Sequence, residues 1–261
     1  MPAFILDLDG TLYSGSMPIP HAADFVALLR RKGLPYVLAT NNSSRTPDDV
    51  AAHLRGFGID AGPGDVLTSA QAAARWLQAR GGVSRVHCVG EAGLRLALSE
   101  AGFELDEDGL GADAVVQGID REFTYGKLER AVHALRAGAA YVLTNPDRLL
   151  PKDGMLTPGA GSLGAALEAA SGVSPVVIGK PSPILLGYAV DKLGLAPDDV
   201  WVVGDNAATD IAGGFRSGYR TALVLTGLAT RDNYREQLAA AGVSADVVAD
   251  DLAELARLLG L

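Results

Sequence analysis

Short apolar runs alternate with helix-forming segments along most of this chain, and this alternation limits the fold more than any other feature. Strands that alternate with helices predict a mostly parallel sheet. In open sheets of this kind, ligands bind outside the carboxyl ends of the strands. We predict strands at 35–39, 85–89, 114–118 and 140–144, and helices at 21–32, 47–57, 69–80, 91–101, 125–137 and 161–171. The chain is therefore expected to have an α/β fold whose functional groups follow its strands.

The segment from Phe4 to Thr11 joins two carboxylates to the end of a buried strand. Alternate side chains of a strand share a face, so we expect Asp7 and Asp9 on the same side of the sheet. Gly10 then allows a sharp turn. Two carboxylates held so close need a cation or a shared proton, and Mg²⁺ is a hard cation that suits oxygen ligands. Taken alone, the pattern also fits a strand that ends in solvated turn residues, because Asp-Gly is common in turns.

Three later apolar runs, at 34–39, 176–179 and 200–204, also end in polar groups. They lead into Thr40, Asn41 and Asn42, into Lys180, and into Asp205, Asn206 and Asp210, respectively. If these strands share one parallel sheet with the first, their carboxyl ends bring acids, amides, a hydroxyl and a lysine to one edge. That set of groups suits one phosphorylated ligand and one Mg²⁺.

In order along the chain, DLDGTL, TNN, GKP and GDNAATD resemble motifs I to IV of the haloacid dehalogenase (HAD) superfamily. The longer segments at 7–20, 40–47, 144–163 and 179–183 resemble its NagD-like branch, which contains p-nitrophenyl, phosphoglycolate and pyridoxal phosphatases. The resemblance covers nearly the whole chain. It implies a phosphatase acting on small phosphate monoesters.

The resemblance also implies the domain organisation. NagD-like proteins have a Rossmann-like three-layer core with a parallel sheet, and a smaller α/β cap of type IIA inserted between motifs II and III. We therefore predict the core over 1–81 and 176–261 and the cap over 82–175, with a hinge at Gly81-Gly82. The residues alone would fit one long sheet equally well.

The resemblance assigns catalytic roles to the two carboxylates of the first motif. Asp7 would attack the phosphoryl group and form an aspartyl-phosphate. Asp9 would protonate the leaving alcohol and then activate water, which requires a raised pKa. The Mg²⁺ ligands would be the Asp7 side chain, the backbone carbonyl of Asp9 and the Asp205 side chain.

The remaining polar groups would bind phosphate or support the metal. Thr40, Asn41 and Asn42 would bind phosphoryl oxygens, although a capped loop before the helix at 47–57 is the alternative. Lys180 would neutralise charge on the transferred group. Asp210 and Asn206 are expected to contact the metal ligands rather than the metal itself. Asp210 would orient metal-bound water or Lys180, and direct contact of Asp210 with the metal is the alternative. Asp205 could also simply cap the next helix.

The cap residues Asn145, Asp147, Arg148 and Leu150 are expected to face the leaving group and select the substrate. Pyridoxal phosphate is less favoured, because the pyridoxal phosphatases have a His where this chain has Leu150. Phosphoglycolate, glycerol phosphate, sugar phosphates and nucleoside monophosphates all remain candidates for the small phosphorylated metabolite. No residue selects among them.

Composition restricts the partners and the location. The chain has 261 residues, of which 48% are hydrophobic, so it can bury a substantial core. A net charge of −9 argues against binding nucleic acid, which needs clustered Lys and Arg. The chain has no run of about 18 apolar residues and no leader of the charged-then-apolar kind. We expect a cytoplasmic protein without membrane contact, which could form a homodimer through the cap.

Two other functions would use the same residues. A HAD phosphomutase would use Asp7 and Asp9 but return the phosphoryl group to a second hydroxyl. A non-catalytic, phosphate-sensing regulator would be phosphorylated on an aspartate, but receiver domains are about half this length and have no cap. The cap segments and the complete set of motif residues favour the phosphatase.

Overall fold

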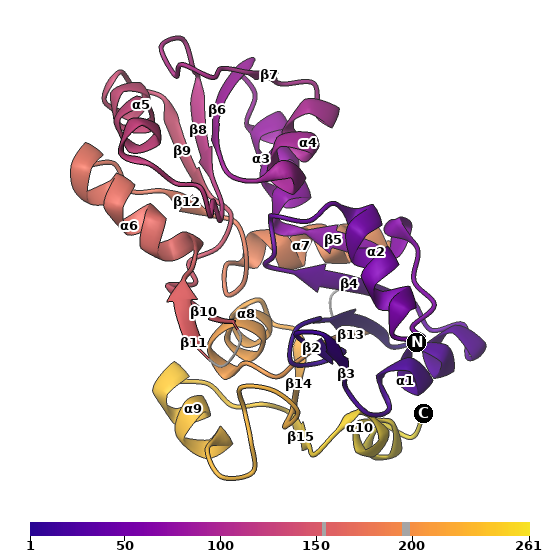
Figure 1. Ribbon diagram of the computed structural model, residues 1–261. Helices are drawn as coiled ribbons and strands as arrows, with labels where there is room; N and C mark the ends of the chain where they lie inside the picture. The colour runs from indigo at the N-terminus through magenta and orange to yellow at the C-terminus, as the bar shows by residue number, and fades with distance from the viewer. Residues whose placement is uncertain (153–154, 195–198) are drawn as a thin grey trace. The chain divides into compact units, whose positions relative to one another are not determined.

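The computed structural model describes residues 1–152, 155–194 and 199–261, and the chain divides into two compact units. Asp153 and Gly154, within the segment 144–163 that resembles the NagD-like branch, lie outside the described residues. Each unit is built on its own sheet of strands with flanking helices (Figure 1). The first unit comprises Met1–Thr40, Asp48–Leu67 and Lys180–Leu261, and the second comprises Asn41–Pro47 and Thr68–Gly179. The predicted boundaries near residues 81 and 175 stay a prediction.

A six-stranded sheet forms the centre of the first unit, with the strand order β15-β14-β13-β1-β4-β5. β1 lies between β13 and β4 and is parallel to both. The carboxyl ends of these three strands therefore lie at the same edge of the sheet. The strands are β1 (Ala3–Leu6), β4 (Tyr36–Thr40), β5 (Val66–Thr68), β13 (Val200–Gly204), β14 (Arg220–Val224) and β15 (Val247–Ala249).

Helices cover this sheet on both faces. Phe4 and Leu6 of β1 point to one face, where they join a buried cluster with Phe25 of α1 and Leu252 of α10. Ile5 alternates to the other side, and α7 and α8 pack against β1, β4 and β14. The helices of this unit are α1 (Ala22–Arg31), α2 (Pro47–Gly56), α7 (Pro183–Leu193), α8 (Ala212–Arg216), α9 (Tyr234–Ala241) and α10 (Leu252–Leu258). The arrangement confirms the predicted three-layer α/β core.

The second unit has a five-stranded sheet with the order β12-β9-β8-β6-β7, in which each pair of neighbours is parallel. Val89, Val115 and Tyr141 of this sheet share a buried cluster with Leu135 of α5 and Leu167 of α6. An antiparallel hairpin, β10–β11, precedes α6. Its elements are α3 (Ser69–Arg80), β6 (Arg85–Val89), α4 (Ala92–Glu100), β7 (Glu104–Leu105), β8 (Ala114–Gln117), α5 (Tyr125–Arg136), β9 (Ala140–Leu143), β10 (Leu149–Lys152), β11 (Met155–Pro158), α6 (Ala160–Ser171) and β12 (Val176–Val177).

The strand before Lys180 does not share a sheet with the other motif-bearing strands, so the single parallel sheet considered for all four is not formed. Val176–Val177 forms β12 and pairs with β9 in the second unit. The backbone N–H groups of Ile178 and Gly179 extend this pairing to the carbonyls of Leu143 (2.9 Å) and Thr144 (2.8 Å). An apolar run predicts a strand but not its partner, because pairing depends on residues distant in sequence.

Across the described parts of the chain, none of the helices is both long enough and apolar enough to cross a membrane.

Candidate active site

The first motif turns sharply at the end of β1. The backbone N–H of Asp7 donates to the carbonyl of Val203 (2.9 Å), which continues the pairing of β1 with β13. Gly10 has φ +87°, a conformation that L side chains rarely adopt, and its N–H donates to the Tyr13 carbonyl (2.7 Å). The chain then forms the hairpin of β2 (Tyr13–Ser14) and β3 (Met17–Pro18). The Asp7 side chain is 12% exposed, whereas Asp9 is exposed.

The end of β13 supplies two further buried acids. Asp205 directly follows the strand and is 2% exposed. Its Oδ2 accepts the N–H of Leu228 (2.7 Å), so its carboxylate does not cap the next helix. That role belongs to Asn206, whose side chain accepts the N–H of Ala208 (2.9 Å). Asp210 lies in the π-helical turn Ala207–Ile211 that follows.

Asn206 also positions Asp210. Its backbone N–H donates to Asp210 Oδ2 (3.2 Å), and its carbonyl accepts the N–H of Asp210 (3.0 Å). The hydroxyl of Thr209 donates to the same carboxylate oxygen (3.3 Å). Asp210 is only 1% exposed, and these hydrogen bonds hold its carboxylate in one orientation.

Three carboxylates and one ammonium group meet in the first unit. Asp7, Asp205 and Asp210 each present an oxygen, and these three atoms lie within 4.8 Å of one another. The Lys180 ammonium donates to Asp7 Oδ1 (2.5 Å) and to the carbonyl of Ala39 (3.1 Å), and it lies 2.7 Å from Asp210 Oδ1. Lys180 is only 2% exposed. Sequence positions 7, 180, 205 and 210 thus form one buried cluster.

The electrostatics of the cluster favour an added cation. Burial raises the pKa of Asp7 well above its ordinary value, and the charges of Asp210 and Asp205 add to this effect although Lys180 opposes it. Burial and the charge of Asp210 raise the pKa of Asp205 to about 7. Burial alone would lower the pKa of Lys180, but the carboxylates of Asp210 and Asp7 raise it above its ordinary value. A single ammonium group therefore leaves three buried carboxylates undercompensated.

These residues fit a hard divalent metal ion. The donors are carboxylate oxygens, with neither sulfur nor imidazole among them, and Mg²⁺ is bound in this way. Burial and neighbouring carboxylates raise the pKa values of Asp7 and Asp205, and a divalent cation would oppose this by favouring both charged forms.

Two of the three predicted phosphate-binding residues of motif II belong to the second unit. Thr40 is buried at the carboxyl end of β4 in the first unit. The side chain of Asn42 organises a local turn, because its Oδ1 accepts the N–H groups of Ser44 (2.9 Å) and Arg45 (3.1 Å). For the Asn42 side chain, this is the capped-loop arrangement. Asn41 instead bonds to residues far along the chain.

Asn41 and two of the predicted substrate-selecting residues, Asn145 and Asp147, form one hydrogen-bonded cluster. Asn145 donates from Nδ2 to the carbonyl of Asn41 (2.8 Å), and its Oδ1 accepts the N–H of Asp147 (3.1 Å). Asn41 Nδ2 donates to Asp147 Oδ2 (3.3 Å). The carbonyl of Arg148 accepts bonds from Gly159 N–H (2.8 Å) and the Ser162 hydroxyl (2.6 Å).

Leu150 differs from these polar neighbours. It is half-buried and packs against a small apolar cluster of Ile119, Leu143 and Ala160. The glycines at 159 and 161 allow the 145–148 segment to lie close, since a Cβ on Gly161 would stand 2.1 Å from the carbonyl oxygen of Pro146. Both glycines are thus explained by close packing against the 145–148 segment.

Sequence reasoning missed the loop after β14. Leu228 donates to Asp205 through its backbone N–H, and Gly227 lies against the same carboxylate. A signal was present, because β14 is also an apolar run that ends in a polar residue and a glycine, Thr226 and Gly227.

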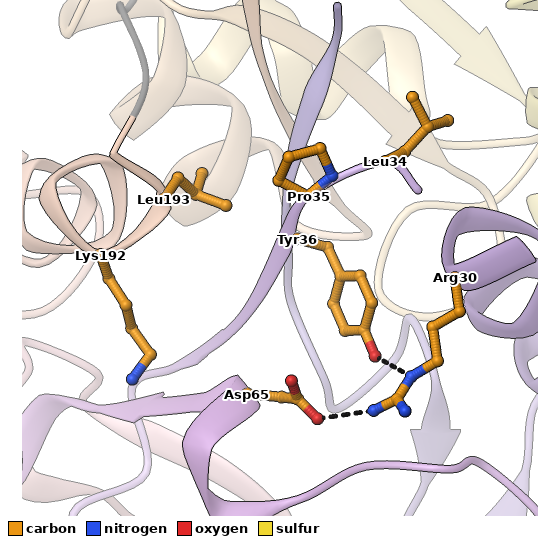
Figure 2. Close-up of a pocket in the computed structure, with 7 residues that line it drawn as sticks. All are labelled: Arg30, Leu34, Pro35, Tyr36, Asp65, Lys192 and Leu193. Atoms are coloured by element: carbon orange, nitrogen blue, oxygen red, sulfur yellow. Dashed lines mark hydrogen bonds and ion pairs between the residues drawn. The ribbon is translucent and has the colours of Figure 1, made fainter. Parts of the chain in front are cut away.

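A pocket of about 360 Å³ lies at the opposite end of β4 (Figure 2). Its lining includes Tyr36, at the start of the strand, together with Arg30, Asp65 and Lys192. Arg30 donates to the hydroxyl of Tyr36 (2.6 Å) and to Asp65 (2.8 Å), so its charge is already paired. The pocket includes none of the predicted site residues.

Several of the known proteins that this chain resembles are phosphatases or nucleotidases. The family model described as haloacid dehalogenase-like hydrolase matches residues 4–104, and a second HAD-hydrolase-like model matches residues 177–255. A 5'-nucleotidase of Bacillus subtilis is 41% identical over 90% of this chain and 91% of that protein. An acid sugar phosphatase of Staphylococcus aureus is 40% identical, over 90% of each chain.

Solved structures agree with these relatives. A p-nitrophenyl phosphatase from Archaeoglobus fulgidus superimposes with a TM-score of 0.94 at 34% identity and covers 98% of each chain. A glycerol phosphate phosphatase from Mycobacterium tuberculosis, solved in complex with magnesium, has a TM-score of 0.88 at 36% identity, over 97% of this chain and 76% of that one. The motif carboxylates lie together at one sheet edge, and the relatives match nearly the full length of the chain. The chain therefore belongs to the NagD-like branch of the haloacid dehalogenase superfamily and is a phosphoric monoester hydrolase of small phosphate substrates.

Proposed function

We propose that this phosphatase uses Asp7 as a nucleophile and needs Mg²⁺, with Asp7, Asp205 and the backbone carbonyl of Asp9 as protein ligands. The observation that carries the proposal is the buried cluster of three carboxylates around Lys180. A bound Mg²⁺ would neutralise these charges and, as a Lewis acid, the charge on a phosphoryl group.

The protein groups then have defined tasks in two displacement steps. An oxygen of Asp7 attacks phosphorus, the P–O bond to the ester oxygen breaks, and Asp9 gives its proton to the leaving alcohol. Asp9 next takes a proton from water, whose oxygen attacks phosphorus, so that Asp7 regains its carboxylate and inorganic phosphate leaves. Lys180 and Thr40, both in the first unit, bind the phosphoryl oxygens, and the same role for the amides of Asn41 and Asn42 stays a prediction. Asp210 holds the Lys180 ammonium in place.

The exposure of Asp9 supports its separate task. A proton donor must reach both the ester oxygen and water, and Asp9 is exposed while Asp7 is largely buried. The Asp9 side chain is also not among the clustered carboxylates, which are Asp7, Asp205 and Asp210.

Metal dependence tests the proposal directly. Protein stripped with EDTA should release no phosphate from p-nitrophenyl phosphate, and added Mg²⁺ should restore the rate. Ca²⁺ should not, because its larger and more flexible ligand shell misplaces the nucleophile. Full turnover in EDTA, unchanged by Mg²⁺, would contradict the metal assignment.

For the substrate, we propose a small phosphorylated metabolite of the kinds named for its relatives: a nucleoside monophosphate, a sugar phosphate or glycerol phosphate. Phosphoglycolate is retained as a fourth candidate, and pyridoxal phosphate is disfavoured by Leu150. A panel of these esters, compared by kcat/KM with Asp7→Asn protein as the blank, identifies the preferred class. Equal and low kcat/KM values for all of them would contradict the proposed substrate class.

A further inference from the structure

We propose that the loop Thr226–Ala229, which follows β14, is a positioning element that fixes the Asp205 carboxylate and thereby sets the affinity of the site for a divalent cation. The proposal rests on the proposed role of Asp205 as a metal ligand. It assigns a function to residues outside all four HAD motifs.

Hydrogen bonds join the loop to two catalytic segments at once. The N–H of Leu228 donates to Asp205 Oδ2 (2.7 Å), and the N–H of Ala229 donates to the backbone carbonyl of Asp205 (2.9 Å). The hydroxyl of Thr226 donates to the carbonyl of Gly10 (2.7 Å), at the turn of the first motif. The loop therefore bonds to both segments that carry the proposed metal ligands.

Gly227 leaves the space that the Asp205 carboxylate occupies. A Cβ on Gly227 would stand 2.1 Å from Asp205 Oδ2 and 2.7 Å from the Cα of Gly10, far inside van der Waals contact. A Cβ on Gly10 would stand 2.2 Å from the same oxygen. Gly10 has a positive φ that explains a glycine by itself, whereas Gly227 is not among the residues with positive φ. At Gly227, glycine is therefore required for space alone.

The carboxylate is consequently fixed on several sides. The backbones of Gly10 and Gly227 both lie against it, Leu228 donates to one oxygen, and the hydroxyl of Thr11 lies 3.4 Å from the other. Rotation about the side-chain bonds of Asp205 would break the Leu228 bond or drive an oxygen into a glycine backbone. Groups that orient metal ligands in this way commonly change metal affinity by about 10–100-fold when they are mutated.

The test measures Mg²⁺ binding by metal-stripped full-length protein, from the rise in melting temperature with Mg²⁺ concentration. Gly227→Ala should weaken binding by about 10–100-fold. Thr226→Val, which removes only the bond to Gly10, should weaken it by a smaller factor, and Thr226→Ser should restore it. Gly187→Ala is the matched control, because a Cβ there meets nothing within 4 Å, and its Mg²⁺ affinity should equal that of the wild type.

Asp205→Asn separates the two levels of the argument. If wild-type protein binds Mg²⁺ and Asp205→Asn binds it poorly, the metal site is supported; Gly227→Ala with wild-type affinity would then overturn the role of the loop. If Asp205→Asn binds Mg²⁺ as well as wild type, the metal assignment itself fails, and the positioning role fails with it. Should Gly227→Ala fail to fold, equal affinities of Thr226→Val and Thr226→Ser would overturn the proposal, and a lower affinity of Thr226→Val would support it.

Discussion

At the scale of single residues, the chain buries three carboxylates and one lysine where an apolar core would be more stable. Asp205, Asp210 and Lys180 are each at most 2% exposed. Such a cluster is retained at a cost in stability, because desolvating charges takes more free energy than most pairs return. A catalytic role for these charges explains why they are buried at this cost. Removal of one of them should therefore change both activity and stability.

Lys180→Met should impair both activity and metal-free stability. Loss of the ammonium leaves Asp7 and Asp210 without their cation, so unfolding in EDTA should become easier by about 3–5 kcal/mol. The kcat should fall by a factor on the order of 100 to 1000, as when one stabilising group is removed from a transition state. Thermal melts in EDTA and in Mg²⁺, together with steady-state rates, measure both effects.

Lys192→Met is the control for this variant, because Lys192 is an exposed lysine near the end of α7. Lys192→Met should change neither the stability in EDTA nor kcat. Equal melting temperatures for Lys180→Met and the wild type in EDTA would show that the ion pairs of Lys180 do not stabilise the fold.

The sequence predicted most of the residues that meet at the site, but not how each is used. Asp7, Lys180, Asp205 and Asp210 were all named from strand ends and motifs, and the structure brings them together. The local use of the Asn206 side chain as a helix cap was not foreseen. The polar end of the β14 run marked the loop as a candidate, but the bond from Leu228 to Asp205 joins positions 23 residues apart and could not be predicted from the local pattern.

At the scale of helices and strands, local signals located the elements well. The predicted helix at 69–80 coincides with α3, where Thr68 and Gln71 form a capping box, and the predicted strand at 85–89 coincides with β6. The hairpins β2–β3 and β10–β11 were missed, because strands of two to four residues carry too little periodicity. The partner of β12 was missed because pairing is decided by distant residues.

Asn145→Ala should change substrate selection more than chemistry. The variant loses the bond to the Asn41 carbonyl and the acceptor for the Asp147 N–H, each worth about 1 kcal/mol. We expect kcat/KM for the preferred natural ester to fall by roughly 5–30-fold, with a smaller fall for p-nitrophenyl phosphate. Gln78→Ala, which removes a side-chain bond to the Ala101 carbonyl elsewhere in the second unit, should change neither value. Equal losses for both substrates would assign Asn145 a structural role alone.

The Asp106 carboxylate should make stability depend on pH. Burial raises its pKa, but the N–H groups of Gly111 and Gly109 and the charge of Arg85 outweigh this and lower the pKa below its ordinary value. A lowered folded-state pKa contributes stability that is present above the unfolded value of about 3.9 and is lost as pH falls through the folded value.

Asp106→Asn should therefore destabilise the protein by about 1–2 kcal/mol at pH 7, and the difference from wild type should shrink below about pH 4. Melting temperatures between pH 3 and 7 measure this. Asp108→Asn, in the same loop with an exposed side chain, is the control and should follow the wild type. A deficit for Asp106→Asn that is constant across this range would contradict the electrostatic explanation.

At the scale of the whole molecule, the chain passes twice from the first compact unit into the second and back. The family resemblance placed the domain boundaries at Gly81-Gly82 and at Val176, and these boundaries stay a prediction. The second compact unit contains α3. Local composition does not show which sheet a flanking helix covers, and α3 packs against α4. A homodimer formed through 82–175 stays a prediction that light scattering of the purified protein can test.

The central claim is that catalysis passes through a phosphoryl group on Asp7. The most direct test is acid quenching during turnover of ³²P-labelled p-nitrophenyl phosphate with Mg²⁺, followed by mapping of the labelled peptide. For the wild type, we predict label on the peptide that contains Asp7. Asp9→Asn should accumulate more label, because the attack of water is slowed whereas the nitrophenolate leaving group needs little protonation. Asp7→Asn should show neither label nor turnover. Turnover by folded Asp7→Asn at near the wild-type rate, or label on a different residue, would contradict the account.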